Sequence, residues 1–268
     1  RHRPYPTCLQ KSLHIMKPIS FAIQEIVSFL PGVKSAEELE KWLNNPSSST
    51  QTDVVSFNRL IPAIISRRLD KGSLFAAEAA AKISEHDSPT YIIFSSRHGE
   101  LAKGEKILTA INQGSEVSPA DFSHSVHNSA SGIFSIAKHI TAPVTSIAAG
   151  EDSFHCALID AVAALEDGAQ GVLVVDFENI LPPLLGRSFP HAPQSFCYAI
   201  GILLKTGTEF SFSPSFSRNR ATLLKSCHIQ SSGYKLPSSL QFLRYSLLRY
   251  REFETFGGNS TFTWRRYE

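Results

Sequence analysis

The middle of the chain holds two histidines that could do chemistry together. His124 and His127 are three positions apart in the run Ser-His-Ser-Val-His-Asn. On a helix this spacing puts both rings on one face, where they could form a metal pair or, with a neighbouring serine, a Ser/His dyad. Asp121 is the only acidic residue close by in the sequence, and no third ligand is evident. We therefore favour a structural or interface role for the two histidines.

Further along, Glu151 is followed closely by two side chains of nucleophilic type, Ser153 and Cys156. Ser153 lacks the GxSxG pattern that presents a serine at a strand-to-helix elbow, so we expect it in the first turn of a helix. Cys156 stands one helical turn beyond Glu151, beside Ala157 and Leu158. An apolar helical face favours a buried, inert thiol over a displaced nucleophile.

Polar side chains also follow two predicted strands. Arg97, His98 and Glu100 come directly after one apolar run, and Asp176 and Glu178 end another. Because the carboxyl ends of parallel strands often bind ligands, the first three residues fit a partner or ligand contact as well as a solvated turn with a salt bridge. For the two acids we favour solvation or helix capping over acid/base catalysis, since no basic partner is in view.

A run of arginines and tyrosines lies in the C-terminal part of the chain. We interpret it as a solvated helix face, with contact to an acidic carrier protein or a partner subunit as the alternative. The run comprises Arg244, Tyr245, Arg249, Tyr250 and Arg251.

Composition sets the class of protein around these residues. The chain has 268 residues, 42% of them apolar, which is enough for one large domain or two small ones with a real core. Its 26 basic and 24 acidic residues leave a formal charge of +2, so nothing in the charge calls for nucleic acid or an anionic membrane surface. No apolar run reaches the roughly 20 residues of a membrane-spanning helix.

The cysteines and the first residues bear on compartment and domain limits. Four cysteines stand far apart without CxxC spacing, which argues against a zinc site and a disulfide framework and favours a reduced, cytoplasmic setting. Residues 1–15 are basic, contain Pro4 and Pro6, and lack the apolar segment of a signal peptide. We treat them as an N-terminal extension, or as a remnant of cloning or upstream translation, and residues 16–268 as a single domain.

The pattern along the chain predicts alternating strands and helices. Strands are expected at residues 19–30, 91–95, 143–148, 172–176, 195–204 and 260–267. Helices are expected after Ser35 and at residues 58–69, 73–84, 99–112, 128–139, 152–165 and 238–250. Residues 44–52 and 210–217 are predicted as loops. Continuous apolar strands separated by helices favour a mainly parallel sheet covered on both faces.

One segment carries a family resemblance. Residues 122–154, FSHSVHNSASGIFSIAKHITAPVTSIAAGEDSF, resemble the β-ketoacyl synthases, condensing enzymes of the thiolase fold. In that family a helix with an Asn, a Gly and a Ser-Ile pair leads through a Pro into a buried strand that ends at the nucleophilic cysteine. Here those places hold Asn128, Gly132, Ser135-Ile136 and Pro143, and the cysteine position falls on Glu151. A slip of one residue would put Gly150 or Asp152 there, and neither is a nucleophilic cysteine.

Three other runs resemble a narrower group, the short ketosynthase-like proteins of aryl-polyene and related type II polyketide systems. They are SSRHGELAKGEKIL, GVLVVDFENILPP and SFCYAIGILL. The resemblance implies a layered α/β/α, thiolase-like fold that is mostly the first half of a ketosynthase, with an irregular C-terminal tail. Residues 16–268 would then be truncated relative to a full condensing enzyme. The histidine pair of a complete enzyme would be missing, with His228 as the candidate after residue 204.

The replacement at Glu151 decides the function that the resemblance implies. In a condensing enzyme the helix that follows the cysteine lowers the pKa of its thiol, so that a thiolate accepts the acyl chain. A carboxylate at this position is not expected to carry the acyl chain, and it would repel a malonyl carboxylate. Chain-length factors, the inactive partners of type II polyketide ketosynthases, also replace the cysteine, commonly with Gln. We therefore expect a subunit without independent activity and without catalytic residues of its own.

Such a subunit would heterodimerise with an active β-ketoacyl synthase and shape its acyl tunnel, in aryl-polyene, type II polyketide or fatty-acid-like biosynthesis. An acyl carrier protein is the further expected partner, and no cofactor, metal, nucleic acid or membrane span is expected. By resemblance, the residues that pair across the dimer or line the tunnel are Phe122, Val126, Ser129, Phe134, Thr145, Ser146, Ile147 and Ala148.

Two other interpretations stay open at this point. The chain could act alone as a decarboxylase or hydrolase of acyl thioesters, using Glu151 or a nearby Ser/His pair. It could also be a homodimeric binding scaffold that pairs through the same strand, residues 145–148.

Overall fold

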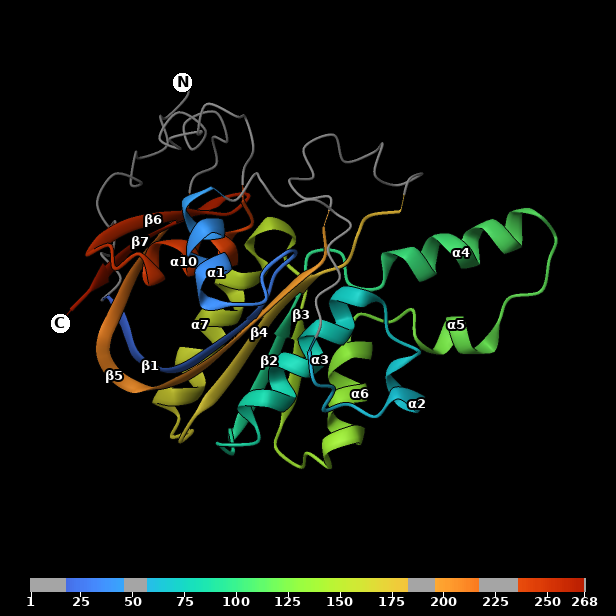
Figure 1. Cartoon of the computed structure of the whole chain (residues 1–268), viewed down its shortest axis with the longest axis horizontal. Coiled ribbons are helices and arrows are strands. Elements are labelled where there is room, and N and C mark those ends of the chain that lie inside the picture. Colours follow the sequence, from blue (N-terminus) through green and yellow to red (C-terminus); the bar gives the residue numbers. More distant parts are fainter. Residues whose placement is uncertain (1–17, 46–56, 183–195, 217–235, 268) are drawn as a thin grey trace, which may run out of the picture.

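The computed structural model describes residues 18–45, 57–182, 196–216 and 236–267, which build a seven-stranded sheet with helices on both faces (Figure 1). The strands are β1 Ile19–Phe29, β2 Tyr91–Ser95, β3 Val144–Ile147, β4 Val172–Glu178, β5 Tyr198–Phe216, β6 Glu252–Phe256 and β7 Ser260–Arg266. The helices are α1 Ala36–Asn44, α2 Ala63–Ser66, α3 Lys71–Ile83, α4 Leu101–Asn112, α5 Pro119–Ser123, α6 Ser129–Lys138, α7 Ser153–Glu166 and α10 Ser238–Leu247. A 3-10 turn, η2 Gly150–Asp152, precedes α7.

The strand order is β3-β2-β4-β5-β7-β6, with β1 paired to β5, and the prediction of a mainly parallel sheet is wrong. Among the described strands, β2 runs parallel to β3 and β4, whereas every other pairing is antiparallel. Helices follow β2 and β3 and return the chain to the same end of the sheet, which parallel pairing requires. A short turn at Gly257 and Gly258 joins β6 to β7, and such a turn gives an antiparallel pair.

Two apolar cores lie on the two faces of the sheet, as the continuous apolar strands predict. On one face Leu173 and Val175 of β4 belong to the core formed with α3 and α6. On the other face Val172 and Val174 belong to the core formed with α7 and α10. Because successive side chains of a strand point to opposite faces, one apolar run fills both cores.

The alanine-rich helix α3 packs directly on β5, because its small side chains permit a close approach. A Cβ atom added at Gly201 of β5 would lie 3.0 Å from Ile83 Cδ1 and 3.4 Å from Ala79 Cβ. Helix α1 is also as predicted, because Glu38 N donates to Ser35 Oγ (3.2 Å) and Ser35 N donates to Glu38 Oε2 (3.1 Å) in a capping box.

The helix predicted at residues 58–69 is wrong over most of its length, since α2 covers Ala63–Ser66 alone. Pro62 disfavours helical backbone at the residue before it. The backbone N–H groups of Leu60 and Ile61 instead donate to the buried carboxylate of Glu78, at 2.8 and 3.2 Å. Burial raises the pKa of Glu78, and these hydrogen bonds oppose that rise.

The loop predicted at residues 210–217 is also wrong, because β5 continues through Phe216. Phe210 and Phe212 are buried, and this segment pairs with β7 over its whole length. The alternation of phenylalanine with serine has the period of a strand, and it outweighs the serines and Pro214, which favour a loop. Strand β6 and helix α5 were not predicted, whereas α10 and β7 confirm the helix and the strand expected near the C-terminus. The loop predicted at residues 44–52 lies mostly outside the described residues, as do Cys8, Cys227 and His228.

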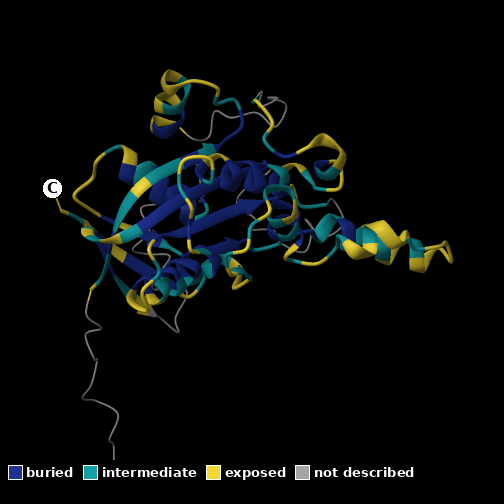
Figure 2. Cartoon of the chain, turned by 90° about the horizontal axis from the view of Figure 1, so that it is seen from below, coloured by how far each residue is buried: buried dark blue, intermediate teal, exposed yellow. Residues whose placement is uncertain are grey.

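Helices α4 and α5 project from the body of the molecule, and much of this arm is exposed (Figures 1 and 2). Its exposed apolar side chains include Leu108 (64%), Ile111 (60%) and Phe122 (66%). No helix in the described ranges is both long and apolar enough to cross a membrane.

Candidate functional site

Glu151 lies at the turn between the edge strand β3 and helix α7, the place where the resemblance puts it. Among the described strands β3 pairs with β2 alone, so its other edge carries no strand. After Ala148 and Ala149 the chain enters η2, where Gly150 has a φ of +63°. A residue with a side chain is strained in this left-handed region, so glycine makes the tight turn into α7 possible.

Glu151 forms an ion pair with Arg97, which follows β2. Arg97 Nη1 lies 3.3 Å from Glu151 Oε1, and the two side chains are 22% and 19% exposed. The two charges therefore meet in a partly shielded place at the carboxyl ends of neighbouring strands. The sequence left open a ligand or partner contact and a solvated turn with a salt bridge. The salt bridge is present, but the turn is largely buried and not solvated, with Glu100 only 3% exposed.

The backbone of the Arg97 turn is held from below by the buried carboxyl group of Glu178. Arg97 N donates to Glu178 Oε1, and His98 N donates to Oε2 at 3.3 Å. Ser96 N donates to Ile147 O of β3 at 3.2 Å. Burial first, and then the Coulomb interaction with Asp176, raises the pKa of Glu178 to about 8. The side chain of Arg97 thus extends from a turn whose backbone is fixed by several hydrogen bonds.

Asp176 lies two residues before Glu178 on the same face of β4, and it is also buried. Ser95 Oγ donates to Asp176 Oδ1 (2.6 Å), and Tyr198 OH donates to Oδ2 (2.9 Å). Burial raises the pKa of Asp176 to about 6. The predicted solvation of Asp176 and Glu178 is wrong, because β4 continues to residue 178 and places both acids inside the fold.

A further polar network ties the Arg97 turn to the start of α3. Asn179 Nδ2 donates to Gly99 O (3.0 Å), and Asn179 Oδ1 accepts from Gly72 N (2.7 Å). Glu100 accepts hydrogen bonds from Ser73 Oγ and Lys103 Nζ. A Cβ atom at Gly72 would overlap the backbone of Glu178, so glycine permits this close approach.

The surroundings of His98, His124 and His127 support structural roles for these three histidines. Burial and the charge of Arg97 lower the pKa of His98 to about 4. His127 Nε2 lies 2.9 Å from Ser96 O, and a Cβ atom added at Gly99 would lie 2.8 Å from His127 Cδ2, so the ring packs closely on this glycine. Burial, with the charges of Arg68 and Lys103, lowers the pKa of His124. Within the described ranges no three His, Cys, Asp or Glu side chains gather as a metal site.

Asp152, next to Glu151, binds the turn between β6 and β7. Its carboxylate accepts from Gly258 N (3.1 Å), Asn259 N (3.1 Å) and Ser260 Oγ. Burial opposes ionisation of Asp152, but hydrogen bonds from His155, Ser260 and Asn259 outweigh it and lower its pKa to about 2. We call Asp152 and residues 257–260 the hairpin clasp.

His155 strengthens the hairpin clasp from the first turn of α7. Its Nδ1 lies 2.9 Å from Ser260 Oγ, and its Nε2 lies 2.8 Å from Thr255 Oγ1. The ring stacks on Phe262 with centroids 4.0 Å apart. Sequence reasoning missed the clasp, although Gly257-Gly258 just before the last strand was a usable signal for a turn.

Ser153 lies in the first turn of α7, as the sequence predicts, whereas Cys156, which was expected to be buried, is only partly so. Ser153 is the first residue of α7, and its Oγ donates to Gly150 O (2.7 Å) and accepts from Ala149 N (2.9 Å). Cys156 is half-buried, and burial together with the charge of Asp152 raises the pKa of its thiol. A raised pKa reduces the thiolate that a nucleophile needs.

The residues expected to line a tunnel or form an interface fall into three places. Thr145, Ser146 and Ile147 are half-buried on the edge strand β3, with Ala148 immediately after it. Ser129 and Phe134 are buried on α6, and Phe134 packs against Phe94 with centroids 5.9 Å apart. Phe122 on α5 and Val126 just before α6 are 66% and 50% exposed. Ser131 Oγ and Ser146 Oγ lie 3.1 Å apart and connect α6 to β3.

The arginine and tyrosine run is only partly a solvated face. Arg244 Nε donates to Leu43 O at 2.6 Å, and Tyr245 packs against Phe253 with centroids 5.4 Å apart. Tyr250 is 49% exposed. Helix α10 ends at Leu247, before Arg249 and Arg251.

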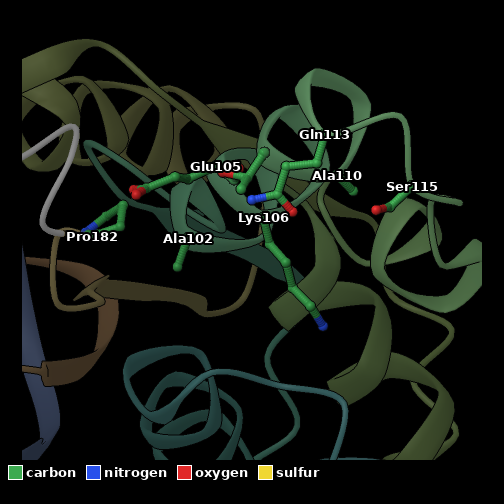
Figure 3. A pocket seen from close by; sticks show the side chains of 8 residues that line it. Ala102, Glu105, Lys106, Ala110, Gln113, Ser115 and Pro182 are labelled. Carbon is green, nitrogen blue, oxygen red and sulfur yellow. Dashed lines mark hydrogen bonds between the residues drawn. The ribbon is translucent and has the colours of Figure 1, made fainter.

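A surface hollow of about 370 Å³ runs along α4 (Figure 3). It is lined mainly by α4, from Ala102 to Ala110, with Gln113, Ser115 and Pro182 completing the lining. None of the residues of the Glu151 site lines it.

The sequence model of the β-ketoacyl synthase N-terminal domain matches residues 39–265, and the chain belongs to this family. A search among proteins of curated function gave no match.

Solved structures with a similar fold come from condensing enzymes. A chain in the complex of the ketosynthase ApeO with its chain length factor ApeC, from Xenorhabdus doucetiae, is 27% identical with a TM-score of 0.81, over 92% of this chain and 99% of that chain. The ishigamide ketosynthase/chain length factor is 14% identical with a TM-score of 0.61, over 81% and 74%. A β-ketoacyl synthase from Burkholderia phymatum STM815 is 10% identical with a TM-score of 0.64, over 93% and 100%.

These likenesses confirm the thiolase-like fold. The family match and the first structure also confirm the resemblance to ketosynthases and their chain length factors. At 14% and 10% identity, the second and third comparisons concern the fold alone.

Proposed function

We propose that this chain is a non-catalytic, chain-length-factor-like subunit that heterodimerises with an active β-ketoacyl synthase and shapes its acyl tunnel. Aryl-polyene or another type II polyketide or fatty-acid-like pathway is the proposed setting. The observation that carries the proposal is the ion pair of Glu151 with Arg97 at the position where a condensing enzyme has its cysteine.

The chemistry of this position supports a non-catalytic role. An acyl chain is carried as a thioester on a thiolate, and Glu151 offers a carboxylate already paired with a guanidinium. The nearest thiol along α7, Cys156, has a raised pKa, and Ser153 Oγ is engaged by Ala149 and Gly150 at the helix start. The Ser/His alternative for a stand-alone enzyme gains no support. His127 Nε2 contacts a backbone oxygen, Ser96 O, and the charge of Arg68 acts on His124.

The edge of the sheet supports a partner. Strand β3 has one edge without a described neighbour, and its side chains are half-buried in the isolated chain. An open edge is a ready surface for pairing with a strand of another chain. The likeness to a chain in the ApeO and ApeC complex supports a ketosynthase as that partner, and another similar structure holds a ketosynthase with an acyl carrier protein.

Helix α6 then supplies the proposed wall of the tunnel. Ser129 is 6% exposed, and its Oγ donates to His124 O at 2.9 Å. A larger side chain at this position would extend toward the proposed tunnel and shorten the cavity. In this proposal Phe122 and Val126 close the tunnel from the exposed α5 side.

The test is co-expression with the ketosynthase encoded beside this chain, followed by size-exclusion chromatography and product analysis. We expect a stable heterodimer, and Ser129→Phe should make a shorter product than the unsubstituted complex. Ile111→Phe, on the exposed arm, is the matched control and should leave product length unchanged. An intact Ser129→Phe complex with unchanged product length would contradict the tunnel assignment, and failure to co-elute would contradict the partner.

The same preparation separates the proposal from a stand-alone enzyme. The chain alone, incubated with malonyl and acyl carrier thioesters, should show no decarboxylation or hydrolysis. Turnover that is lost in Glu151→Ala would contradict the non-catalytic role.

A further inference from the structure

We infer that Arg97 forms a binding site for a small carboxylate and that Glu151 fills this site from within the chain. The inference rests on the proposed function and deepens it, because it gives a reason why this subunit does not take a malonyl group. The ligand class is a carboxymethyl group, the –CH2–COO⁻ end of malonate and of malonyl thioesters.

The backbone of the Arg97 turn is fixed before any ligand arrives. Backbone N–H groups of Arg97 and His98 donate to the buried Glu178, and Gly99 N donates to Ser96 Oγ at 2.8 Å. A rigid turn limits the conformational freedom that binding would otherwise have to remove. Arg97 is 22% exposed, so its charge is shielded from bulk water but can be reached.

The turn that carries Glu151 is also fixed by its neighbours. Glu151 extends from a turn that has Gly150 on one side and Asp152 on the other. Asp152 is held by hydrogen bonds from Gly258 N and Asn259 N of the hairpin clasp. A Cβ atom at Gly258 would lie 3.5 Å from Glu151 Cβ, so the β6–β7 turn packs against the stem of this side chain. The 3.3 Å ion pair is thus made between two preorganised groups.

The part of Glu151 beyond its Cβ atom is itself a carboxymethyl group. Glu151→Ala keeps Cβ and removes the –CH2–COO⁻ group from beside Arg97. A guanidinium binds carboxylates through directed, charge-assisted hydrogen bonds. The variant should therefore take up malonate or acetate where the native protein does not.

The experiment measures malonate binding to the full chain by thermal shift and by isothermal calorimetry, with sodium chloride at equal ionic strength as the reference. Glu151→Ala should bind malonate, and the native chain should bind it several-fold more weakly, by up to roughly fivefold, because malonate would first have to displace the Glu151 carboxylate from Arg97. Adding Arg97→Gln to Glu151→Ala should abolish the gain.

Glu252→Ala is the matched control, because it also removes a carboxylate from an arginine, Arg265, but at an exposed pair with 60% and 68% exposed side chains. It should gain no malonate binding. Glu151→Ser is the second variant if Glu151→Ala fails to fold, and the same gain is expected for it. Equal binding by the native chain and a folded Glu151 variant, or a gain that survives Arg97→Gln, would overturn the inference.

The outcome is independent of the partner. A failure here, with an intact heterodimer, would leave the proposed function in place. Malonate binding by the variant with no heterodimer would leave the carboxylate site in place and contradict the proposed function.

Discussion

Glu151 and Asp152 are neighbouring acids on one turn, and their surroundings differ. Glu151 pairs with Arg97 at the open edge of the sheet, next to β3. Asp152 binds backbone and side-chain donors of residues 258–260, which come from the far end of the chain. In the proposed function the first acid stands where a condensing enzyme has its cysteine, whereas the contacts of the second acid hold the turn between β6 and β7. The comparison therefore sets a proposed functional position beside a structural one.

The largest effect is expected at the hairpin clasp. Asp152→Ala removes the carboxylate that accepts hydrogen bonds from Gly258 N, Asn259 N and Ser260 Oγ. The same change removes the carboxylate beside His155. We expect the free energy of unfolding to fall by about 3 kcal/mol, measured by urea denaturation. Asp152→Asn, which keeps the shape and one acceptor, should lose less. A loss in Asp152→Ala no larger than in an exposed control such as Glu252→Ala would contradict the structural role.

The clasp also has a pH signature. The pKa of Asp152 is about 2 in the folded chain against an ordinary value of 3.8, so the folded state binds fewer protons between these values. Its contribution to stability is complete above about pH 3.8 and is lost as the pH falls toward 2. This part of the acid unfolding curve should be missing in Asp152→Ala.

The next effect is expected at the glycine that meets Asp152. A Cβ atom at Gly257 would overlap Asp152 Oδ1, whereas one at Gly258 would lie at an ordinary 3.4 Å from Asp152 Oδ2. Gly257→Ala should therefore destabilise the chain by about 1–3 kcal/mol, and Gly258→Ala by clearly less. Thermal unfolding of the two variants side by side tests this. Equal melting temperatures would mean that the clasp tolerates displacement.

A third effect concerns the acids beneath Arg97. The pKa of Glu178 is raised from 4.5 to about 8, so the folded state binds more protons than the unfolded state between these values. Stability from this group is complete below about pH 4.5 and declines as the pH rises toward 8. Glu178→Gln should flatten the decline above about pH 6, while Asp176, with its pKa near 6, should keep part of the decline below that value. An unchanged slope between pH 6 and 8 would contradict the assignment to Glu178.

The smallest effect on stability is expected at Glu151 itself. Ion pairs near the surface contribute roughly 0–1 kcal/mol and are weakened by salt. Glu151→Gln should change the free energy of unfolding by less than about 1 kcal/mol, measured by denaturation at low and high salt. A loss comparable to that of Asp152→Ala would show that both acids are structural.

Sequence reasoning reached the turn at Glu151 but not the network that fixes it. The motif from Asn128 to Pro143 places the edge strand and the turn, because its spacing is local and carries the family resemblance. For Asp176 and Glu178 the sequence favours solvation or helix capping, since it shows no basic partner for them. The structure extends β4 to residue 178 and buries both acids beside Ser95 and Tyr198.

The hairpin clasp depends on contacts between residues more than a hundred positions apart. Asp152 meets Gly258 and Asn259 through the fold, and no periodicity in the sequence predicts that pairing. The extension of β5 was predictable in part, because Phe210 and Phe212 alternate with serine, but Pro214 pointed to a loop. Local pattern thus gives most of the elements, and the long-range polar contacts come from the structure alone.

Intact-mass spectrometry of the heterodimer tests the central claim most directly. The complex, incubated with an acyl carrier thioester that loads the ketosynthase, should gain the acyl mass on the ketosynthase subunit and none on this chain. An acyl adduct on this chain would contradict the account, because it would mean that the chain itself carries the acyl group although it has Glu151 at the proposed cysteine position.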